Sequence, residues 1–197
     1  SAEVTLVARE DTHAVHILPN PDFDKVNFSS LEELRAATAR LGYHGGVRLI
    51  QATCKVFTDL AKRSGIVLKD VGFDLSYRTD IPRMVGLSGS SAIIVATFDV
   101  LMEFFSLSPE KLGKQKHEWP QVVLDVERIE LGLSAGLQDR VIQVYGGLVL
   151  MDFTESTPGE SSSPFLSSPS SFTSLDVSLL PCLYLAYCTD MAGESGK

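Results

Sequence analysis

Two groups of residues in this chain combine types and spacing that could support chemistry. The first is the Gly/Ser-rich stretch GLSGSSA, residues 86–92, which stands directly before an apolar run of helical length. The second is a pair of carboxylates, Glu127 and Asp139, which are twelve residues apart with the turn SAGLQ just before Asp139. The first group could bind an anion, and the second could hold a metal ion or accept a proton.

The stretch 86–92 has two interpretations. Gly86 and Gly89 allow positive φ angles and a close approach of the backbone to a ligand. The first turn of the following helix carries unpaired N–H groups and the positive end of the helix dipole, which suits phosphate. The alternative is a plain strand-to-helix turn in which Ser90 or Ser91 caps the helix. A Walker A loop is excluded because no lysine follows Gly89.

The two carboxylates are predicted to lie on successive helices. The stretch 120–132 begins with a proline, which is favourable in the first turn, and ends at a glycine. Asp139 opens the next predicted helix, 136–147. Carboxylates on helices joined by a tight turn can converge on one cleft, where one binds a metal ion and the other accepts a proton. Alternatively, each is a solvated charge or a helix cap.

The elements that must position these residues follow from hydrophobic periodicity and from cap residues. Ser30 and Glu33 fit a capping box, which predicts a helix that begins at residue 31 and ends near residue 42. A helix within 45–65 that ends at Gly65 is predicted by five residues that would share one face at helical spacing: Val47, Ile50, Cys54, Phe57 and Ala61. Two strands joined by a polar turn are predicted over 3–19, and a strand with rough alternation over 71–77. Further strands are predicted over 148–153 and 180–187.

The composition changes between residues 154 and 174. More than half of these residues are Ser or Thr, and the only charges are Glu155 and Glu160. Such a segment is typical of a surface insertion or a linker. It divides the chain into a first domain, 1–153, and a remainder, 175–197.

Composition and charge narrow the class of protein. Of the 197 residues, 44% are hydrophobic and 21% charged, which is typical of a soluble globular protein. A formal net charge of −8 disfavours nucleic acid and anionic membranes as partners. Three cysteines without a CxxC pair, Cys54, Cys182 and Cys188, indicate reduced thiols in a cytoplasmic protein.

The two groups of residues also resemble the motifs of one family. PRMVGLSGSSA, from Pro82 to Ala92, resembles the ATP-binding motif of the GHMP small-molecule kinases, with one additional residue, Ser88 or Gly89. The segment from Glu127 to Asp139 resembles the part of these kinases that supplies a Mg²⁺ ligand and a catalytic base. Together with several other stretches, the motifs resemble the plant-type glucuronokinase branch: GYHGGVRLIQATCKVF, GLQDRVIQVYGGLVLMDF and DVSLLPCLYLAY.

This resemblance implies an α+β fold with two lobes. Residues 1–153 would form most of an ATP-binding lobe similar to domain 2 of ribosomal protein S5. Residues 175–197 would begin a ferredoxin-like second lobe. The family's early G-N-P-S-D segment and its late G-G-x-G-x-G motif are not present in the sequence. We therefore expect a fragment of a kinase that has little activity by itself.

The resemblance also implies an activity and a role for each residue. The activity is ATP-dependent phosphorylation of the anomeric hydroxyl of D-glucuronate, which gives glucuronate 1-phosphate for UDP-glucuronate salvage. Ser90 and Glu127 would ligate Mg²⁺, and Asp139 would accept the hydroxyl proton or orient that hydroxyl. The residues that would wrap the ATP phosphates are Pro82, Gly86, Leu87, Ser88, Gly89, Ser90, Ser91 and Ala92.

The carboxylate of a uronate requires a cation, preferably the fork of an arginine. Arg140 and Arg83 are the candidates, and the alternative is that either is a surface cation. Other functions also remain open. They are a GHMP sugar kinase for galactose, arabinose or a heptose, and a non-catalytic protein that binds a nucleotide or a sugar. An RNA-binding module of the S5 type is disfavoured by the acidic charge.

Overall fold

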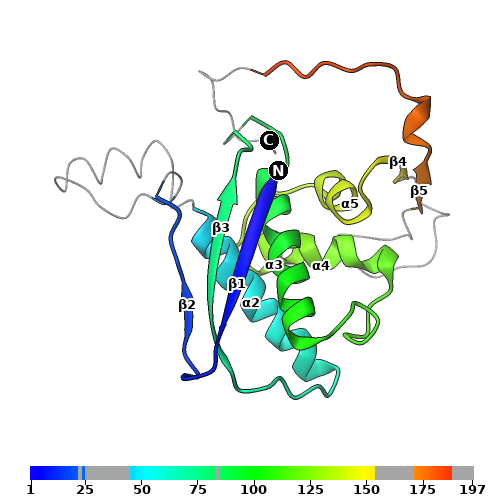
Figure 1. Cartoon of the computed structure of the whole chain (residues 1–197). Coiled ribbons are helices and arrows are strands. Elements are labelled where there is room, and N and C mark those ends of the chain that lie inside the picture. Colours follow the sequence, from blue (N-terminus) through cyan, green and yellow to red (C-terminus); the bar gives the residue numbers. More distant parts are fainter. Residues whose placement is uncertain (22–23, 25–44, 83–84, 154–170, 188–197) are drawn as a thin grey trace.

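The computed structural model describes residues 1–21, 24, 45–82, 85–153 and 171–187. The helix predicted over 31–42, with Ser30 and Glu33 as its capping box, lies outside these residues. The described part contains a three-stranded sheet, a group of helices packed against it, and a separate two-stranded sheet (Figure 1). Within the described ranges, no helix is both long and apolar enough to cross a membrane.

The central strand of the three-stranded sheet is β3, Gly72–Thr79. Strand β1, Ala2–Arg9, pairs with it antiparallel, and the short strand β2, Val15–Ile17, pairs with its other edge in parallel. Alternate side chains of β3 are buried: Phe73, Leu75 and Tyr77. This alternation is the pattern of a sheet that is covered on one face. The strands predicted for these regions are confirmed.

Helix α2, Gly46–Arg63, confirms the amphipathic helix predicted for this region. Three residues of its predicted apolar face are at most 1% exposed, and these are Ile50, Phe57 and Ala61. The two others, Val47 and Cys54, are only partly buried. The helix ends just before Gly65, whose φ of 71° suits the left-handed position after a helix. The predicted stop is therefore confirmed.

Helix α3, Gly89–Phe105, is apolar around most of its circumference. Such a helix must be buried on several sides, and α3 packs against β1, α2 and α5. Its Phe98 side chain is fully buried and meets the ring of Trp119 edge to face, with 5.1 Å between the ring centroids. Helix α3 is therefore the centre of the core, and the loop before it is anchored to the most buried element.

The chain then passes through a short 3-10 turn, Lys116–Glu118, into helix α4, Trp119–Asp125. The helix continues as one turn of π-helix, Val126–Glu130, before the chain turns into helix α5, Leu137–Tyr145. The two helices predicted on either side of the SAGLQ turn are therefore confirmed. The π turn is not visible in the hydrophobic pattern.

The second sheet pairs β4, Leu148–Asp152, with β5, Ser171–Leu175, in antiparallel register. Strand β5 lies mostly inside the segment 154–174, whose composition is typical of a linker; pairing with β4 overrides that composition. A 3-10 turn follows at Val177–Leu179. The strand predicted at 180–187 is wrong, because residues 181–187 have no regular secondary structure and pair with none of the described strands.

The two described cysteines should differ in reactivity. Partial burial on α2 raises the pKa of the Cys54 thiol to about 11, so about 0.1% of it is thiolate at pH 8. Cys182 is exposed. We expect iodoacetamide at pH 8 to alkylate Cys182 readily and to modify Cys54 only after unfolding in urea, as followed by peptide mass mapping. Equal rates in the folded protein would contradict this assignment.

Candidate active site

The loop between β3 and α3 turns sharply just before the helix begins. Gly86 and Ser88 both have left-handed backbone conformations, with φ angles of 74° and 58°. For a serine this conformation costs about 1–2 kcal/mol, so the surrounding structure must hold it in place. Apart from its two chain neighbours, no described residue has an atom within 4 Å of the position that a Cβ of Gly86 would occupy. A ligand therefore has open space beside the backbone at this glycine.

The serines of this loop do not cap the helix as the simpler interpretation predicted. Ser88 occupies the N-cap position and makes no side-chain capping bond, while Ser90 and Ser91 lie inside the first turn of α3. The prediction that Ser90 or Ser91 caps the helix is therefore wrong, because the helix begins earlier, at Gly89. The Ser91 side chain is fully buried, and its hydroxyl has no hydrogen-bond partner among the described residues.

Glu127 lies in the π turn that continues α4. The extra residue of a π turn rotates the side chains that follow it, and such turns are frequent at functional sites. Glu127 is only 4% exposed, which is unusual for a carboxylate unless it is paired. Its backbone carbonyl accepts a hydrogen bond from the N–H of Leu133, 2.8 Å away, which ties the turn before α5 to the π turn.

Arg140 is the partner of this buried carboxylate. Its Nη2 donates to Oε2 of Glu127 in a short ion pair, and its Nη1 donates to the carbonyl of Gly136 at 2.8 Å. The same Nη1 lies 3.4 Å from Oδ2 of Asp139. Burial lowers the pKa of Arg140 to about 10, so the guanidinium is charged at neutral pH. One cation thus contacts both carboxylates that the sequence singled out.

Asp139 differs from Glu127 in its exposure to solvent. It lies in the first turn of α5, after the N-cap residue Gly136, where a negative charge interacts favourably with the helix dipole. Its side chain is 40% exposed. Asp139 is therefore accessible to a ligand from solvent, whereas the side chain of Glu127 is almost completely buried.

The helix packing brings these parts to one region of the molecule. Helix α5 contacts both α3 and α4, and it lies beside the end of α3 that follows the loop (Figure 1). At that end, the side chain of Ile81 lies 3.4 Å from the position that a Cβ of Gly89 would take. Pro82 is partly buried, and Arg83 lies outside the described residues. The predicted loop and the predicted carboxylates therefore belong to neighbouring elements.

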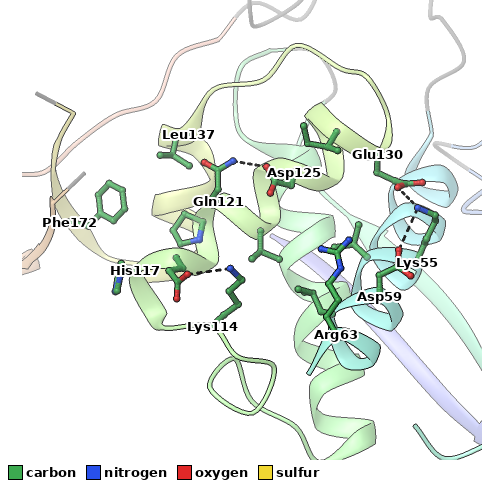
Figure 2. A pocket seen from close by; sticks show the side chains of 16 residues that line it. Lys55, Asp59, Arg63, Lys114, His117, Gln121, Asp125, Glu130, Leu137 and Phe172 are labelled. Atoms are coloured by element: carbon green, nitrogen blue, oxygen red, sulfur yellow. Dashed lines mark hydrogen bonds and ion pairs between the residues drawn. The ribbon is translucent and has the colours of Figure 1, made fainter. Parts of the chain in front are cut away.

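A cavity of about 620 Å³ lies on another side of these helices. Figure 2 shows its lining, which comes from α2, the 3-10 turn, α4, the π turn and the start of α5, with Phe172 of β5 at its edge. Many of its charged side chains pair with one another, as Lys55 does with Glu130 at 2.5 Å and Asp59 at 3.7 Å. Neither Glu127 nor Asp139 lines it, so this cavity is separate from the predicted site.

Sequence reasoning found the two carboxylates and missed the way they are connected. Arg140 was expected to face a substrate, whereas its side chain is 3% exposed and paired with Glu127. The signal that could have found the pair is the rule that a carboxylate inside an apolar helix needs a cation. Glu127 stands next to Val126 and close to Val122 and Val123, which predicts burial.

Comparison with known proteins assigns the chain to a family. The family described as "GHMP kinases N terminal domain" matches residues 48–147, a region that includes the loop, α3, Glu127 and Asp139. The chain therefore belongs to the GHMP kinase family. Within the described residues, the matched region has mixed α and β content, with strand β3 and helices α2 to α5.

Three individual proteins that are similar to this chain are all sugar kinases by name. The chain is 44% identical to glucuronokinase 1 of Arabidopsis thaliana over 97% of its own length and 50% of that protein. It is 43% identical to probable glucuronokinase 2 of the same plant over 92% of the chain and 47% of the relative. A D-glycero-alpha-D-manno-heptose 7-phosphate kinase of Campylobacter jejuni is 27% identical over 76% of the chain and 39% of that kinase.

The chain spans about half the length of the two plant relatives. No solved structure matches the chain significantly. The family is therefore established by sequence, and the geometry described above comes from this chain alone.

Proposed function

We propose that this chain is the ATP-binding part of a kinase that phosphorylates the anomeric hydroxyl of D-glucuronate and forms glucuronate 1-phosphate. The product would serve UDP-glucuronate salvage. The observation that carries the proposal is that Glu127 and Asp139 contact one guanidinium beside the start of α3. This arrangement occurs in a chain that is 44% identical to a glucuronokinase over 97% of the chain's own length.

The proposal includes a division into lobes. Residues 1–153 would form most of a lobe similar to domain 2 of ribosomal protein S5, and residues 175–197 would begin a ferredoxin-like lobe. Residues 154–174 would join the two. The separate pairing of β4 with β5 supports a change of architecture near this junction.

The start of α3 fits the phosphates of ATP. The loop has open space beside Gly86, and the first helical turn supplies N–H groups and the positive end of the dipole. The hydroxyl of Ser91, in the same turn, is buried and has no partner among the residues that the structure describes, so one donor of this turn is unused. Gly86 to Ala92, with Pro82 fixing the approach of the chain, would hold the phosphates there.

The residues present also fit Mg²⁺, which binds oxygen donors and commonly takes only one or two from the protein. The hydroxyl of Ser90 and the carboxylate of Glu127 would be those donors. Within the described part of the chain, no group of three or more acidic, His or Cys side chains gathers as a metal cage. A bound Mg²⁺ would neutralise charge on the phosphates during transfer.

Asp139 would act on the sugar. Its half-exposed carboxylate accepts the proton of the anomeric hydroxyl as that oxygen bonds to the γ-phosphorus, and the bond from this phosphorus to the bridging oxygen of ADP breaks. The contact with Arg140 at 3.4 Å restricts where the carboxylate can point. Phosphoryl transfer depends mainly on such positioning and on charge neutralisation.

The cation for the uronate carboxylate would be Arg83 or Arg140. Burial and the ion pair with Glu127 leave Arg140 poorly placed for this role, because a substrate would have to compete with that carboxylate. Arg83, in the phosphate loop, therefore becomes the favoured candidate. On this proposal, the protein binds ATP, Mg²⁺ and the sugar, and it acts in the cytoplasm. Nucleic acid and membranes are not among its partners.

A coupled ADP-release assay tests this function. It would use a longer protein that contains this chain and spans the full length of its plant relatives, with Mg·ATP and a panel of sugars. We expect turnover with glucuronate that exceeds turnover with galactose, arabinose and heptoses. Preference for one of those sugars would indicate a different GHMP sugar kinase. A folded protein that is silent with every sugar but binds ATP would favour a non-catalytic binding protein.

A further inference from the structure

The contacts of Arg140 indicate a role that is different from binding substrate. Its side chain is 3% exposed, and its two terminal nitrogens donate to three groups of the protein. These groups are the carboxylate of Glu127, the carboxylate of Asp139 and the carbonyl of Gly136. They belong to the π turn, to the first turn of α5 and to the N-cap of α5.

A guanidinium is suited to this junction because its donors are fixed in one plane and point in different directions. Nη2 is used for Glu127 and Nη1 for Gly136 and Asp139. An ammonium on a flexible stem cannot hold three acceptors in one fixed geometry. The charge of Arg140 also compensates the buried Glu127, which would otherwise be costly in this position.

We propose that Arg140 is a positioning residue that fixes Glu127 and Asp139 relative to each other. This inference rests on the proposed function, since it assigns a role within that reaction. The guanidinium holds the start of α5 against the π turn and so sets the direction of the Asp139 carboxylate. Loss of this geometry should slow the chemical step and leave the affinity for the sugar nearly unchanged.

Replacement of Arg140 by Lys in the longer protein tests the inference. Lysine keeps the charge beside Glu127 and loses the fork. We expect kcat to fall about 10- to 100-fold, as for other groups that position catalytic residues, and KM for glucuronate to change by less than about threefold. The matched control is Arg63→Lys, an exposed position in the last turn of α2, which should leave both constants unchanged.

Other results separate the possible failures. A selective rise in KM for glucuronate with kcat intact would overturn the inference and make Arg140 a ligand of the substrate carboxylate. An unchanged kcat after correction for the folded fraction would reduce its role to stability. Absence of turnover in the unmodified longer protein would overturn the proposed function first, and the inference with it.

A second variant keeps the test decisive if Arg140→Lys folds poorly. Arg140→Ala leaves a space beside Glu127 that a small cation can enter. We expect methylguanidinium, at concentrations too low to denature the protein, to restore part of kcat, and methylammonium to restore much less. Equal rescue by the two ions would contradict a role that depends on the planar fork.

Discussion

Replacing Asp139 by Asn is expected to lower kcat of the longer protein by about 10²- to 10⁴-fold, the usual contribution of a general base. The amide has nearly the same shape as the carboxylate and cannot accept the proton of the hydroxyl. KM for Mg·ATP should change little, because the proposed phosphate site is the loop before α3 and the first turn of α3, whereas Asp139 lies on α5. KM for glucuronate should change little because asparagine keeps a hydrogen-bonding group of the same size at this position. Steady-state kinetics at saturating substrates measure this effect.

The control for this variant is Asp125→Asn, one helix earlier. Asp125 accepts a hydrogen bond of 2.6 Å from Gln121 and lines the separate cavity. Its replacement should leave kcat within about twofold of the original value, as expected for a residue that makes no contact specific to the transition state. A decrease of less than about tenfold for Asp139→Asn would remove Asp139 from the role of base.

Replacing Phe98 by Ala is expected to destabilise the chain by about 3–5 kcal/mol. The Phe98 side chain is fully buried at the centre of α3 and packs edge to face against Trp119. Its removal loses apolar burial and leaves a cavity that the rigid helices around it close only in part. Urea unfolding of the 197-residue chain, followed by tryptophan fluorescence, measures the free energy.

Phe153→Ala is the matched control, because the Phe153 side chain is 42% exposed after the end of β4. It should cost about 1 kcal/mol, because less of its apolar surface is buried than that of Phe98 and its removal leaves no enclosed cavity. If both variants lost the same free energy, α3 would not be the centre of the core. If Phe98→Ala were nearly neutral, the packing of α3 against α4 described here would be incorrect.

The helices around the site could be predicted from sequence because their signals are local. Residues within α2 repeat at helical spacing, and Gly65 marks its end. Strand β5 was not predicted, and the segment 181–187 was wrongly predicted to be a strand, because the signals for strands are not only local. Strand formation depends on a partner strand as much as on composition: β5 has β4 beside it, and 181–187 has none among the described strands.

The sequence could predict which residues belong to the candidate site, but it could not predict how their side chains are arranged. Spacing and family resemblance identified the loop at 86–92 and the carboxylates Glu127 and Asp139. Neither signal indicates that α4 ends in a π turn, nor that Arg140 turns inward to pair with Glu127. These features depend on how three helices meet, and contacts between helices leave little trace in a single sequence.

The pairing of β1 with β3 has a consequence for the way this chain folds. Arg9 at the end of β1 lies opposite Gly72 at the start of β3, so the pairing closes a loop of 62 residues, 10–71. Contacts this distant along a chain are slow to form, because the entropy of closing the loop is lost before the contacts stabilise it. We therefore expect α2 and α3, which are separated in the chain only by β3 and its loops and which pack together, to associate early. During synthesis on the ribosome, β1 would stay unpaired until β3 has left the ribosomal exit tunnel.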